Sequence, residues 1–547
     1  MRVKRILNMK LKLYLLALPL IVAGCAVTPE PISLAEHMSI AKEDNNRLFA
    51  EQEPVDGALT LEEAVARAVR YNFDHRLAMS EMLLQERQLE MTVSNMLPRL
   101  AASAGYSVRD NDSASSSFSV RTGRQSLEPS ISSERQRETA DLTFTWNLLD
   151  FGVSYYQAKQ QADRALIAVE RRRKIINKLI KEVRIAYGQA TLSQKLLPKI
   201  EPLLKDAQRA LAGTQKIEGE SLDAVLPNLE YRKNLLRVIS QLEQVRADLS
   251  VANAQLASLI NVPQQTRLRV APKPVNLAVM RGKKLDMAEM EKVSLVMHPQ
   301  LREERLQERV DQNSVHKEWV RLLPGVSLTG SLNFDNNQYL LNEVWAEAGV
   351  RVTYNLLNLL VGRDALRAAE AQVELGKTRR LAVSVAVLTQ INVARHQLEN
   401  AVNAFKRSDQ IAAVDSRISK LVTQGGVAQA EPEFETIRRR LEAIAGEMDR
   451  ERARGQIVES MMNLYVAMGI DLMPAGIDEK TSISEMVPIV AEALSRIDAA
   501  EFPTLPPDTL PPSDTTKSAE RIPEAAIGPV ESAGVVFESV NKGTQGL

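Results

Sequence analysis

Residues 326–334 read VSLTGSLNF, and their side chains alternate between an apolar set and a polar set. Gly330 takes the central place of the apolar set, and serine, threonine and asparagine fill the other. Successive side chains of a β-strand point to opposite faces, so this period of two predicts a strand with one apolar and one polar face. The stretch is about as long as a tilted membrane-spanning strand, which needs about 9–11 residues.

Three further segments alternate in the same way, at residues 100–109, 140–148 and 348–356. Four amphipathic strands of a soluble sheet would show the same pattern. In lipid, however, an open sheet edge is not tolerated, and four strands are too few to close a barrel. A membrane location therefore requires several chains. A dimer would supply eight strands and a trimer twelve, and a water-filled lumen favours the trimer.

The chain contains an internal tandem repeat. LTLEEA at 59–64 opens a helical stretch that ends at Pro98, and LDMAEM at 285–290 opens another that ends at Pro324, an offset of 226 residues at both ends. WNLLD at 146–150 then matches YNLLN at 354–358 with an offset of 208. The repeats span 59–263 and 285–472, with a linker at 264–284. The change in offset is one longer loop in the first repeat, Asn111 to Thr139.

Each repeat ends in a long helical hairpin, predicted at 153–262 and 362–469. Along the first outgoing helix, fourteen of sixteen positions at 4-3 spacing from Ala158 to Leu211 are apolar, which predicts a coiled-coil seam. Pro198 and Pro202 interrupt this seam and predict a kink. The expected turns are Gly213 to Gly219 and Gly425-Gly426.

The amino terminus indicates the compartment. Basic residues precede an apolar run at 13–23, which ends in Val22-Ala23-Gly24-Cys25. This pattern predicts a lipoprotein signal peptide at 1–24 and lipidation of Cys25; an ordinary signal peptide with a chance cysteine is the alternative. Ala26, rather than Asp, follows the cysteine, which indicates the outer membrane. Residues 25–58 are then a lipid-anchored linker.

Composition excludes several classes of protein. A net charge of 0 argues against nucleic-acid binding, and one Cys with five scattered His residues gives no disulfide framework and no metal site. No catalytic motif occurs, so we expect no enzyme and no cofactor, although an enzyme with an unrecognised site is a further alternative. After residue 25 no run of about 18 apolar residues occurs. Residues 473–547 form a C-terminal tail, Pro-rich and disordered from about 503.

Three features carry a resemblance to a known family: the lipidation motif that ends at Cys25, the repeated order of helix, two strands and long hairpin, and Asp150-Phe151-Gly152 at the start of a helix. The chain resembles the TolC-like outer-membrane efflux proteins over about 59–472. The resemblance implies a mixed α/β membrane protein in the bacterial outer membrane. It implies a homotrimer whose twelve-stranded β-barrel continues into a long periplasmic α-helical coiled-coil barrel. The function implied is a passive exit duct of a tripartite efflux or type I secretion system, joined through a periplasmic adaptor protein to an inner-membrane transporter. A lipid-anchored periplasmic coiled-coil scaffold without a pore is the alternative.

The same resemblance implies candidate site residues. Gly426-Val427 resembles the family's turn, and the acidic gate position downstream falls on Glu435. Carboxylates there, repeated by threefold symmetry, would form rings that select cations or raise carboxylate pKa values; acidic residues of a first helical turn are the plainer alternative. Glu431 and Glu433 are further gate candidates. Asp415 and Arg417 could form latches between protomers, or they could be ordinary surface charges. The hairpin tips expected to contact the adaptor contain Gly213, Gly219, Gly425 and Gly426.

Two departures from the family pattern are visible. Asn358 to Gly362 replaces a shorter Asp-x-Gly turn, and the first hairpin tip, Gly219 to Asp223, is shorter than the common Gly-x-x-Ser-x-Leu-Asp pattern.

Overall fold

The computed structural model describes residues 30–50, 52–125, 128–214, 225–263, 266–273, 286–424, 432–473 and 481–503. The chain divides into two units, 1–503 and 504–547, and all described residues belong to the first. The predicted signal peptide and the proline-rich part of the tail lie outside the described residues.

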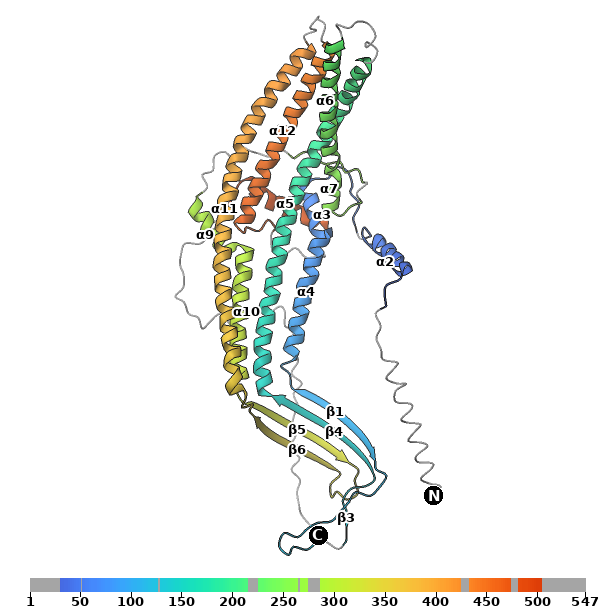
Figure 1. The fold of residues 1–547 in the computed structure, drawn as a ribbon, viewed down its shortest axis with the longest axis vertical. Helices are drawn as coiled ribbons and strands as arrows, with labels where there is room; N and C mark the ends of the chain where they lie inside the picture. The colour runs from blue at the N-terminus through green and yellow to red at the C-terminus, as the bar shows by residue number, and fades with distance from the viewer. Residues whose placement is uncertain are drawn as a thin grey trace. The chain divides into compact units, whose positions relative to one another are not determined.

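Four long strands form one antiparallel sheet in the order β1-β4-β5-β6 (Figure 1). They are β1 (Arg99–Val108), β4 (Gln136–Asn147), β5 (Gly325–Asp335) and β6 (Val344–Thr353). A short hairpin, β2 (Ala114–Ser115) with β3 (Ser130–Ile131), occupies the longer loop of the first repeat. Strands from both repeats thus share one sheet, with β4 paired to β5 at its centre.

Two strand boundaries differ from the sequence prediction. The strand predicted at 348–356 lies at 344–353, because Val344 pairs with Phe334 and extends the hairpin towards its turn. The strand predicted to end at 148 ends at Asn147. The Asn147 side chain accepts a hydrogen bond from the Leu149 amide at 3.0 Å and so starts a helix there.

The helices follow the same order in both repeats, joined by these strands. The first repeat has α3 (Leu61–Tyr71), α4 (Phe73–Ser94), α5 (Leu148–Thr214), α6 (Val225–Ser250) and α7 (Ala252–Leu259). The second has α9 (Met287–Met297), α10 (Pro299–Arg321), α11 (Asn358–Gln424) and α12 (Pro432–Ala467). The outgoing helices α5 and α11 therefore begin earlier than the predicted 153 and 362, and α5 continues through Pro198 and Pro202.

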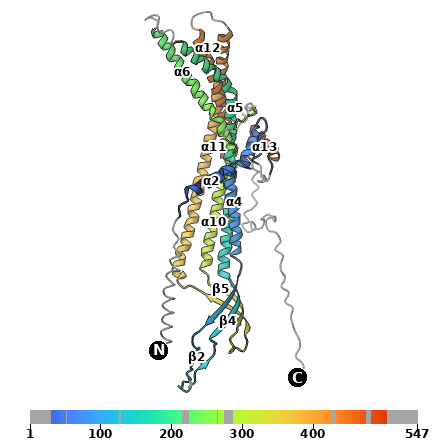
Figure 2. The ribbon, with the colours of Figure 1, turned by 90° about the vertical axis from the view of Figure 1, so that its right-hand side faces the viewer.

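Four helices lie side by side in the order α4, α5, α10, α11, next to the ends of the four strands (Figures 1 and 2). Each helix is continuous in sequence with one strand: α4 leads into β1, β4 into α5, α10 into β5 and β6 into α11. Because the helix order repeats the strand order, α4 and β1 form one edge of the unit, and β6 and α11 form the other.

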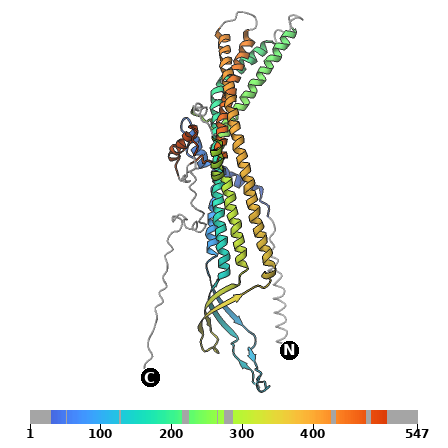
Figure 3. The same cartoon turned by 90° about the vertical axis from the view of Figure 1, so that its left-hand side faces the viewer.

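Beyond this layer, α5 packs with α6 and α12 around a core of aliphatic side chains. Figure 3 shows the ribbon of these helices from another side. Leu196, Ile200 and Leu203 of α5 and Leu235 and Leu242 of α6 are each 0% exposed. Several positions of the predicted seam, including Ile200, Leu204 and Ala207, lie in this core, as a coiled-coil-like contact requires.

Both repeats turn sharply between their first two helices and close in the same way. Asn72 and His298 are 226 residues apart, and each caps the second helix, accepting from the amides of Asp74 (3.0 Å) and Gln300 (3.3 Å) respectively. Each repeat ends in a C-terminal cap with a left-handed residue, Asn261 in the first and Gly469 in the second.

Two helices occur where none was predicted. The 473–547 tail contains α13 (Ile483–Asp498), whose apolar side chains pack on α3, and the 25–58 linker contains α2 (Leu34–Arg47), which has no buried residue. Both begin with a capping box, Ser482 with Glu485 and Ser33 with Glu36. These serine–glutamate pairs are the sequence signals that would have located both helices.

Polar contacts hold α3 and α13 in place beside α5. Arg184 is 5% exposed and forms an ion pair with Asp498 of α13. Lys273 contacts Glu62 of α3 at 2.7 Å. Burial raises the pKa of the Glu62 carboxyl, but the hydrogen bond and positive charge of Lys273 outweigh it, and the pKa is lowered overall. The first contact ties the C-terminal segment to α5, and the second ties α3 to the segment that follows the first repeat.

Candidate functional site

The sheet has two chemically different faces, as the alternation predicts. Pairs such as Leu142 with Leu332 and Leu328 with Val350 place apolar side chains opposite one another, while Thr143 stands opposite Ser331. A shift of one residue would mix the faces, so this register keeps one face mainly apolar and the other mainly polar, with Trp345 and Glu138 as exceptions.

Neither face of the sheet is covered by another described element. Leu100, Val350 and Val352 of the apolar face are 68%, 71% and 65% exposed, and the side chains of β1 and β6 are exposed throughout. Monomeric soluble proteins rarely leave a patch of this kind open. The apolar face therefore requires an apolar environment or a partner.

Aromatic side chains lie near both ends of the apolar face. Trp146 is near the helices, with its ring 5.8 Å from that of Phe151 in an edge-to-face contact, and Tyr106 and Phe334 lie towards the far end. Trp and Tyr concentrate at the two interfaces of membrane-spanning sheets, where a ring meets lipid and water together.

Neither edge of the sheet pairs with another described strand. Among the described strands, β1 pairs with β4 alone and β6 with β5 alone, so each leaves a row of backbone donors and acceptors without a strand partner. β1 runs away from the helices and β6 returns to them. A β6 edge can therefore accept the β1 edge of a second copy in the antiparallel sense used throughout the sheet.

The edge helices carry exposed apolar side chains beside these strands. The α11 stripe consists of Leu375, Leu381, Val385, Val393, Ile411, Val414 and Leu421, each between 48% and 65% exposed. At about 100° per residue they fall on the face opposite to the buried Ile391, Leu398 and Phe405. On α4, Leu77, Leu84 and Met91 recur every seven residues and are more than half exposed.

Two glycines shape the junction between sheet and helices. A Cβ at Gly152 of α5 would lie 3.1 Å from Val320, and a Cβ at Gly362 of α11 would lie 2.2 Å from a methyl carbon of Leu322. The end of α10 therefore lies close to both outgoing helices. Gly362 takes the same place in the second repeat as Gly152 takes in the first. The turn from Asn358 to Gly362 is two residues longer than the turn from Asp150 to Gly152.

Most predicted residues at the hairpin tips lie outside the described residues: Gly219, Gly425, Gly426 and Glu431, as does the predicted lipidation site Cys25. The Glu433 and Glu435 positions belong to the first turn of α12, directly after Pro432. Gly213 is helical, because α5 continues to Thr214, so the predicted first turn begins later than expected.

Asp415 and Arg417 lie on α11 and differ in surroundings. The Asp415 carboxylate lies over Gly446 of α12, where a Cβ would come within 2.9 Å of its oxygen. Burial and the nearby charge of Glu442 raise the pKa of the Asp415 carboxyl, against the opposing charge of Arg439. Arg417 is exposed. The two predicted latch residues therefore do not form one cluster within the chain.

A ladder of ion pairs joins α5 to α12 below this point. Lys195 and Lys199 contact the Glu447 carboxylate at 2.8 and 2.6 Å. Burial alone would raise the pKa of Glu447, but hydrogen bonds from the two lysines lower it overall. Glu447 thus stays charged and holds α12 of the second repeat against α5 of the first. The sequence prediction missed this contact.

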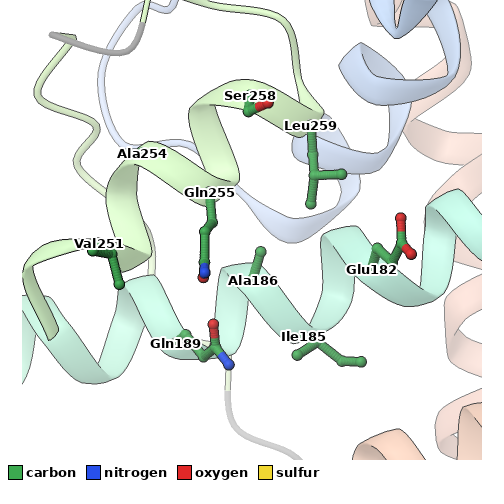
Figure 4. Close-up of a pocket in the computed structure, with 9 residues that line it drawn as sticks. All are labelled: Glu182, Ile185, Ala186, Gln189, Val251, Ala254, Gln255, Ser258 and Leu259. Carbon is green, nitrogen blue, oxygen red and sulfur yellow. The ribbon is translucent and has the colours of Figure 1, made fainter. Parts of the chain in front are cut away.

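One open groove lies beside the helices, away from the sheet. This groove of about 580 Å³ between α5 and α7 is lined by aliphatic side chains and by four polar ones, Glu182, Gln189, Gln255 and Ser258 (Figure 4). It holds no pair of groups arranged for acid–base or nucleophilic work. Within the described ranges, no three His, Cys, Asp or Glu side chains are grouped to hold a metal ion. Among the described helices, none has both the length and the apolarity needed to cross a bilayer.

Comparison with known proteins identifies the fold. The chain matches no family model and no curated protein sequence. It is similar to solved structures of bacterial outer-membrane channels. The open state of the MtrE outer-membrane channel of Neisseria gonorrhoeae gives a TM-score of 0.56 at 16% identity, over 75% of this chain and 89% of that one. The CmeC outer-membrane channel of Campylobacter jejuni gives 0.55 at 13% identity, over 82% and 95%.

CusC, whose structures describe folding and transmembrane channel formation, gives a TM-score of 0.56 at 16% identity over 77% of this chain and 96% of CusC. The chain therefore has the fold of the TolC-like outer-membrane channels, as its sequence resemblance implied. The similarity extends over nearly the full length of these relatives.

Proposed function

We propose that this protein is an outer-membrane channel, which passively conducts solutes delivered through a periplasmic adaptor by an inner-membrane transporter. The fold and its similarity to solved channels support this function. So does the uncovered sheet, whose apolar face suits lipid and whose polar face suits a water-filled lumen.

One observation carries the proposal. The sheet has an apolar face, and its two edge strands, β1 and β6, lack partners among the described strands and run in directions that allow them to pair with each other in an antiparallel sense. In lipid these edges must be satisfied, and a ring of identical chains does so by pairing each β6 with the next β1. With four strands per chain, a homotrimer closes a twelve-stranded barrel.

The helices extend the same arrangement beyond the sheet. In the ring, the α11 stripe of one chain lies beside α4 or α5 of the next and buries apolar surface that each single chain leaves exposed. The result is a periplasmic helical barrel that continues the lumen of the β-barrel. The interface is head-to-tail, so every chain contributes both of its edges.

Lipidation of Cys25 would anchor each chain in the outer membrane in addition to the barrel. At the opposite end, we propose that the hairpin tips around Gly213, Gly219, Gly425 and Gly426 meet the adaptor. Carboxylates at Glu435, with Glu431 and Glu433, would form the periplasmic gate. Asp415 fits a supporting role there, because its pKa is already raised within one chain.

The test is single-channel conductance of the lipidated protein in planar bilayers, with wild type beside Glu435→Ala and Glu431→Ala. We expect discrete steps from a species of trimer mass. In the gate variants we expect larger or less cation-selective steps, because like-charged rings repel and select cations.

Three outcomes have different meanings. A trimer that stays silent in wild type and in both variants would contradict the open conduit. Conducting wild type with unchanged variants would contradict only the carboxylate gate. A monomer that leaves membranes without detergent would favour the lipid-anchored coiled-coil scaffold.

A further inference from the structure

Two arginines lie on the polar face of the sheet, at the end next to the helices and on the two edge strands. Arg99 is the first residue of β1, and Arg351 lies two residues before the end of β6. The register places Arg99 opposite Thr145 and Arg351 opposite Ser327, both on the polar face. Both side chains are exposed.

No carboxylate lies near these arginines on the same face. The neighbouring polar-face positions on this part of the sheet are Ala101, Thr143, Thr145, Asn147, Ser327, Thr329, Gly349 and Thr353. The next acidic residue along β6 is Glu347, four residues from Arg351 and therefore about 13 Å away along the strand. Asp141, further out on β4, already accepts a hydrogen bond from the Thr143 hydroxyl at 2.9 Å.

Arginines at the far end of the sheet are treated differently. Arg137 forms an ion pair with Asp335 across β4 and β5, and Arg135 contacts Asp112 at 2.6 Å. Those positive charges have counter-ions within the chain. Among the described residues, Arg99 and Arg351 form no ion pair, whereas Arg137 and Arg135 each have a carboxylate partner.

We propose that Arg99 and Arg351 form an oxyanion-binding belt where the helical tunnel opens into the β-barrel. The proposal rests on the proposed function, because closing the ring sets β6 beside β1 of the next chain. Each subunit junction then places Arg351 of one chain on the strand next to Arg99 of its neighbour. The ligand class is a solute with a phosphate, sulfate or carboxylate group.

The chemistry of the junction supports this ligand class. Guanidinium groups bind oxyanions through two parallel hydrogen bonds, and rings of arginine line pores that prefer anions. Two positive side chains on adjacent strands repel each other unless an anion lies between them. Hydroxyls of Thr145 and Ser327 on the central strands add neutral donors, whereas the Thr329 hydroxyl already donates to the Gly349 carbonyl at 3.2 Å.

The belt has a direction. A solute from the helical tunnel meets the arginines first and the carboxylates Glu347 and Asp141 afterwards. An anion is thus attracted to the belt and repelled just beyond it, which concentrates anionic solutes at the base of the barrel. This is an affinity step within the duct and is separate from any gate at the hairpin tips.

The experiment compares wild type with Arg99→Gln, Arg351→Gln and the double variant. The control is Arg121→Gln with Arg124→Gln, which removes two exposed charges from the outer loop. Two readouts are used: the anion-to-cation permeability ratio in a KCl gradient, and inorganic phosphate binding to the detergent-solubilised trimer by calorimetry. We expect the double variant to lower the ratio at least threefold and weaken phosphate binding at least tenfold, with little change in the control.

Charge-retaining variants keep the test decisive if a glutamine variant fails to assemble. Arg99→Lys with Arg351→Lys should restore the permeability ratio but only part of the phosphate affinity, because lysine lacks the bidentate fork. If the double variant forms conducting trimers whose permeability ratio and phosphate binding match those of wild type, that result would overturn the belt and leave the proposed channel intact. Wild-type trimers that bind no phosphate would also overturn it, while a silent wild type that binds phosphate would contradict the channel alone.

Discussion

Helices α5 and α11 occupy the same place in the two repeats, each has 67 residues, and each follows a strand that returns from the far end of the sheet. Their surroundings differ. α5 lies inside the layer and buries Ile200, Leu203 and Leu204 against α6 and α12. α11 lies at an edge and has apolar side chains on two opposite faces, of which only one is buried within the chain.

The comparison shows that duplication supplied two similar helices and that position in the layer gave them different tasks. α5 stabilises the single chain. α11 stabilises the chain on one face and leaves a second apolar face exposed, which the proposed ring would cover. The following predictions test this division of roles, in order of decreasing effect.

Charges placed in the α11 stripe should abolish assembly. In Leu381→Asp with Val385→Asp, carboxylates replace side chains that are 60% and 65% exposed in the single chain. Folding of the chain should change little, whereas burying two unpaired charges between chains should prevent trimer formation altogether. The measurement is mass by light scattering in detergent, with circular dichroism to follow folding.

Gln372→Asp is the control, at another exposed position of α11 that is not part of the stripe. It should leave the trimer intact. A trimer of normal mass in the double aspartate variant would show that the stripe is not an interface.

Truncating the two helices at corresponding depths should separate their roles. Ile200 is 0% exposed and Ile411 is 57% exposed. Ile200→Ala should cost about 2–5 kcal/mol in the free energy of unfolding of the chain, as other buried large-to-small changes do. Ile411→Ala should cost under about 0.5 kcal/mol there and act instead on trimer dissociation. Each alanine substitution is placed in the double aspartate variant, which should be monomeric, and the free energy of unfolding is measured with urea. Equal losses of stability from the two substitutions would contradict the comparison.

The closing turn of the second repeat should be less tolerant than that of the first. Gly469 has φ +71°, and a Cβ there would lie 2.3 Å from the Cα of His298. Gly469→Ala should cost about 2–4 kcal/mol, from the left-handed backbone and from the backbone clash. Urea denaturation followed by circular dichroism measures it.

Two controls locate the cause. Gly188→Ala on α5 has open space around it and should be neutral or stabilising by up to about 1 kcal/mol. Gly469→Asn should remain destabilised, because asparagine tolerates the left-handed region, as Asn261 does in the first repeat, but still meets His298. Recovery in the asparagine variant would assign the whole effect to backbone conformation.

Acid should weaken the second repeat more than the first at the helix corner. Burial, with the charges of Lys174 and Arg173, lowers the pKa of His298 to about 4, whereas the corresponding residue, Asn72, does not titrate. Between about pH 6.5 and 4 the unfolded chain binds a proton that the folded chain does not. Stability should therefore fall as pH falls through this window and level off below it.

His298→Asn keeps a capping side chain and removes the titration. The free energy of unfolding of the variant minus that of wild type should be about 2 kcal/mol larger at pH 5 than at pH 8. His75 is a second contributor: burial lowers its pKa, and its Nε2 accepts from Arg172 at 3.2 Å, so some acid sensitivity should persist. Parallel pH profiles of the two proteins would contradict the role of His298.

The strands and long helices were predictable because their periods appear in the sequence. Val326, Leu328 and Leu332 alternate regardless of what surrounds them, and the 4-3 spacing through Ile200 and Leu204 predicts a seam without tertiary information. The strand ends were less predictable. Asn147 begins a helix where the apolar alternation still continues, because a local side-chain hydrogen bond decides the boundary.

The edges and the belt could not be read from periodicity. Ile411 and Ile391 are equally apolar in sequence, and only packing shows that one is exposed and the other buried. Arg99 and Arg351 are 252 positions apart in the chain, and the sheet order brings them to opposite edges of the same face. The gate glutamates rest on resemblance and stay a prediction.

The head-to-tail ring that we propose would have a genetic consequence. Every chain in such a ring supplies one edge to each neighbour, so a chain with a damaged β6 edge and an intact β1 edge can still join and leave a seam open. When such chains equal normal ones in number, roughly one eighth of rings contain only normal chains. An allele of this kind would suppress transport in a cell that still carries the normal gene, whereas an allele that damages both edges would be recessive.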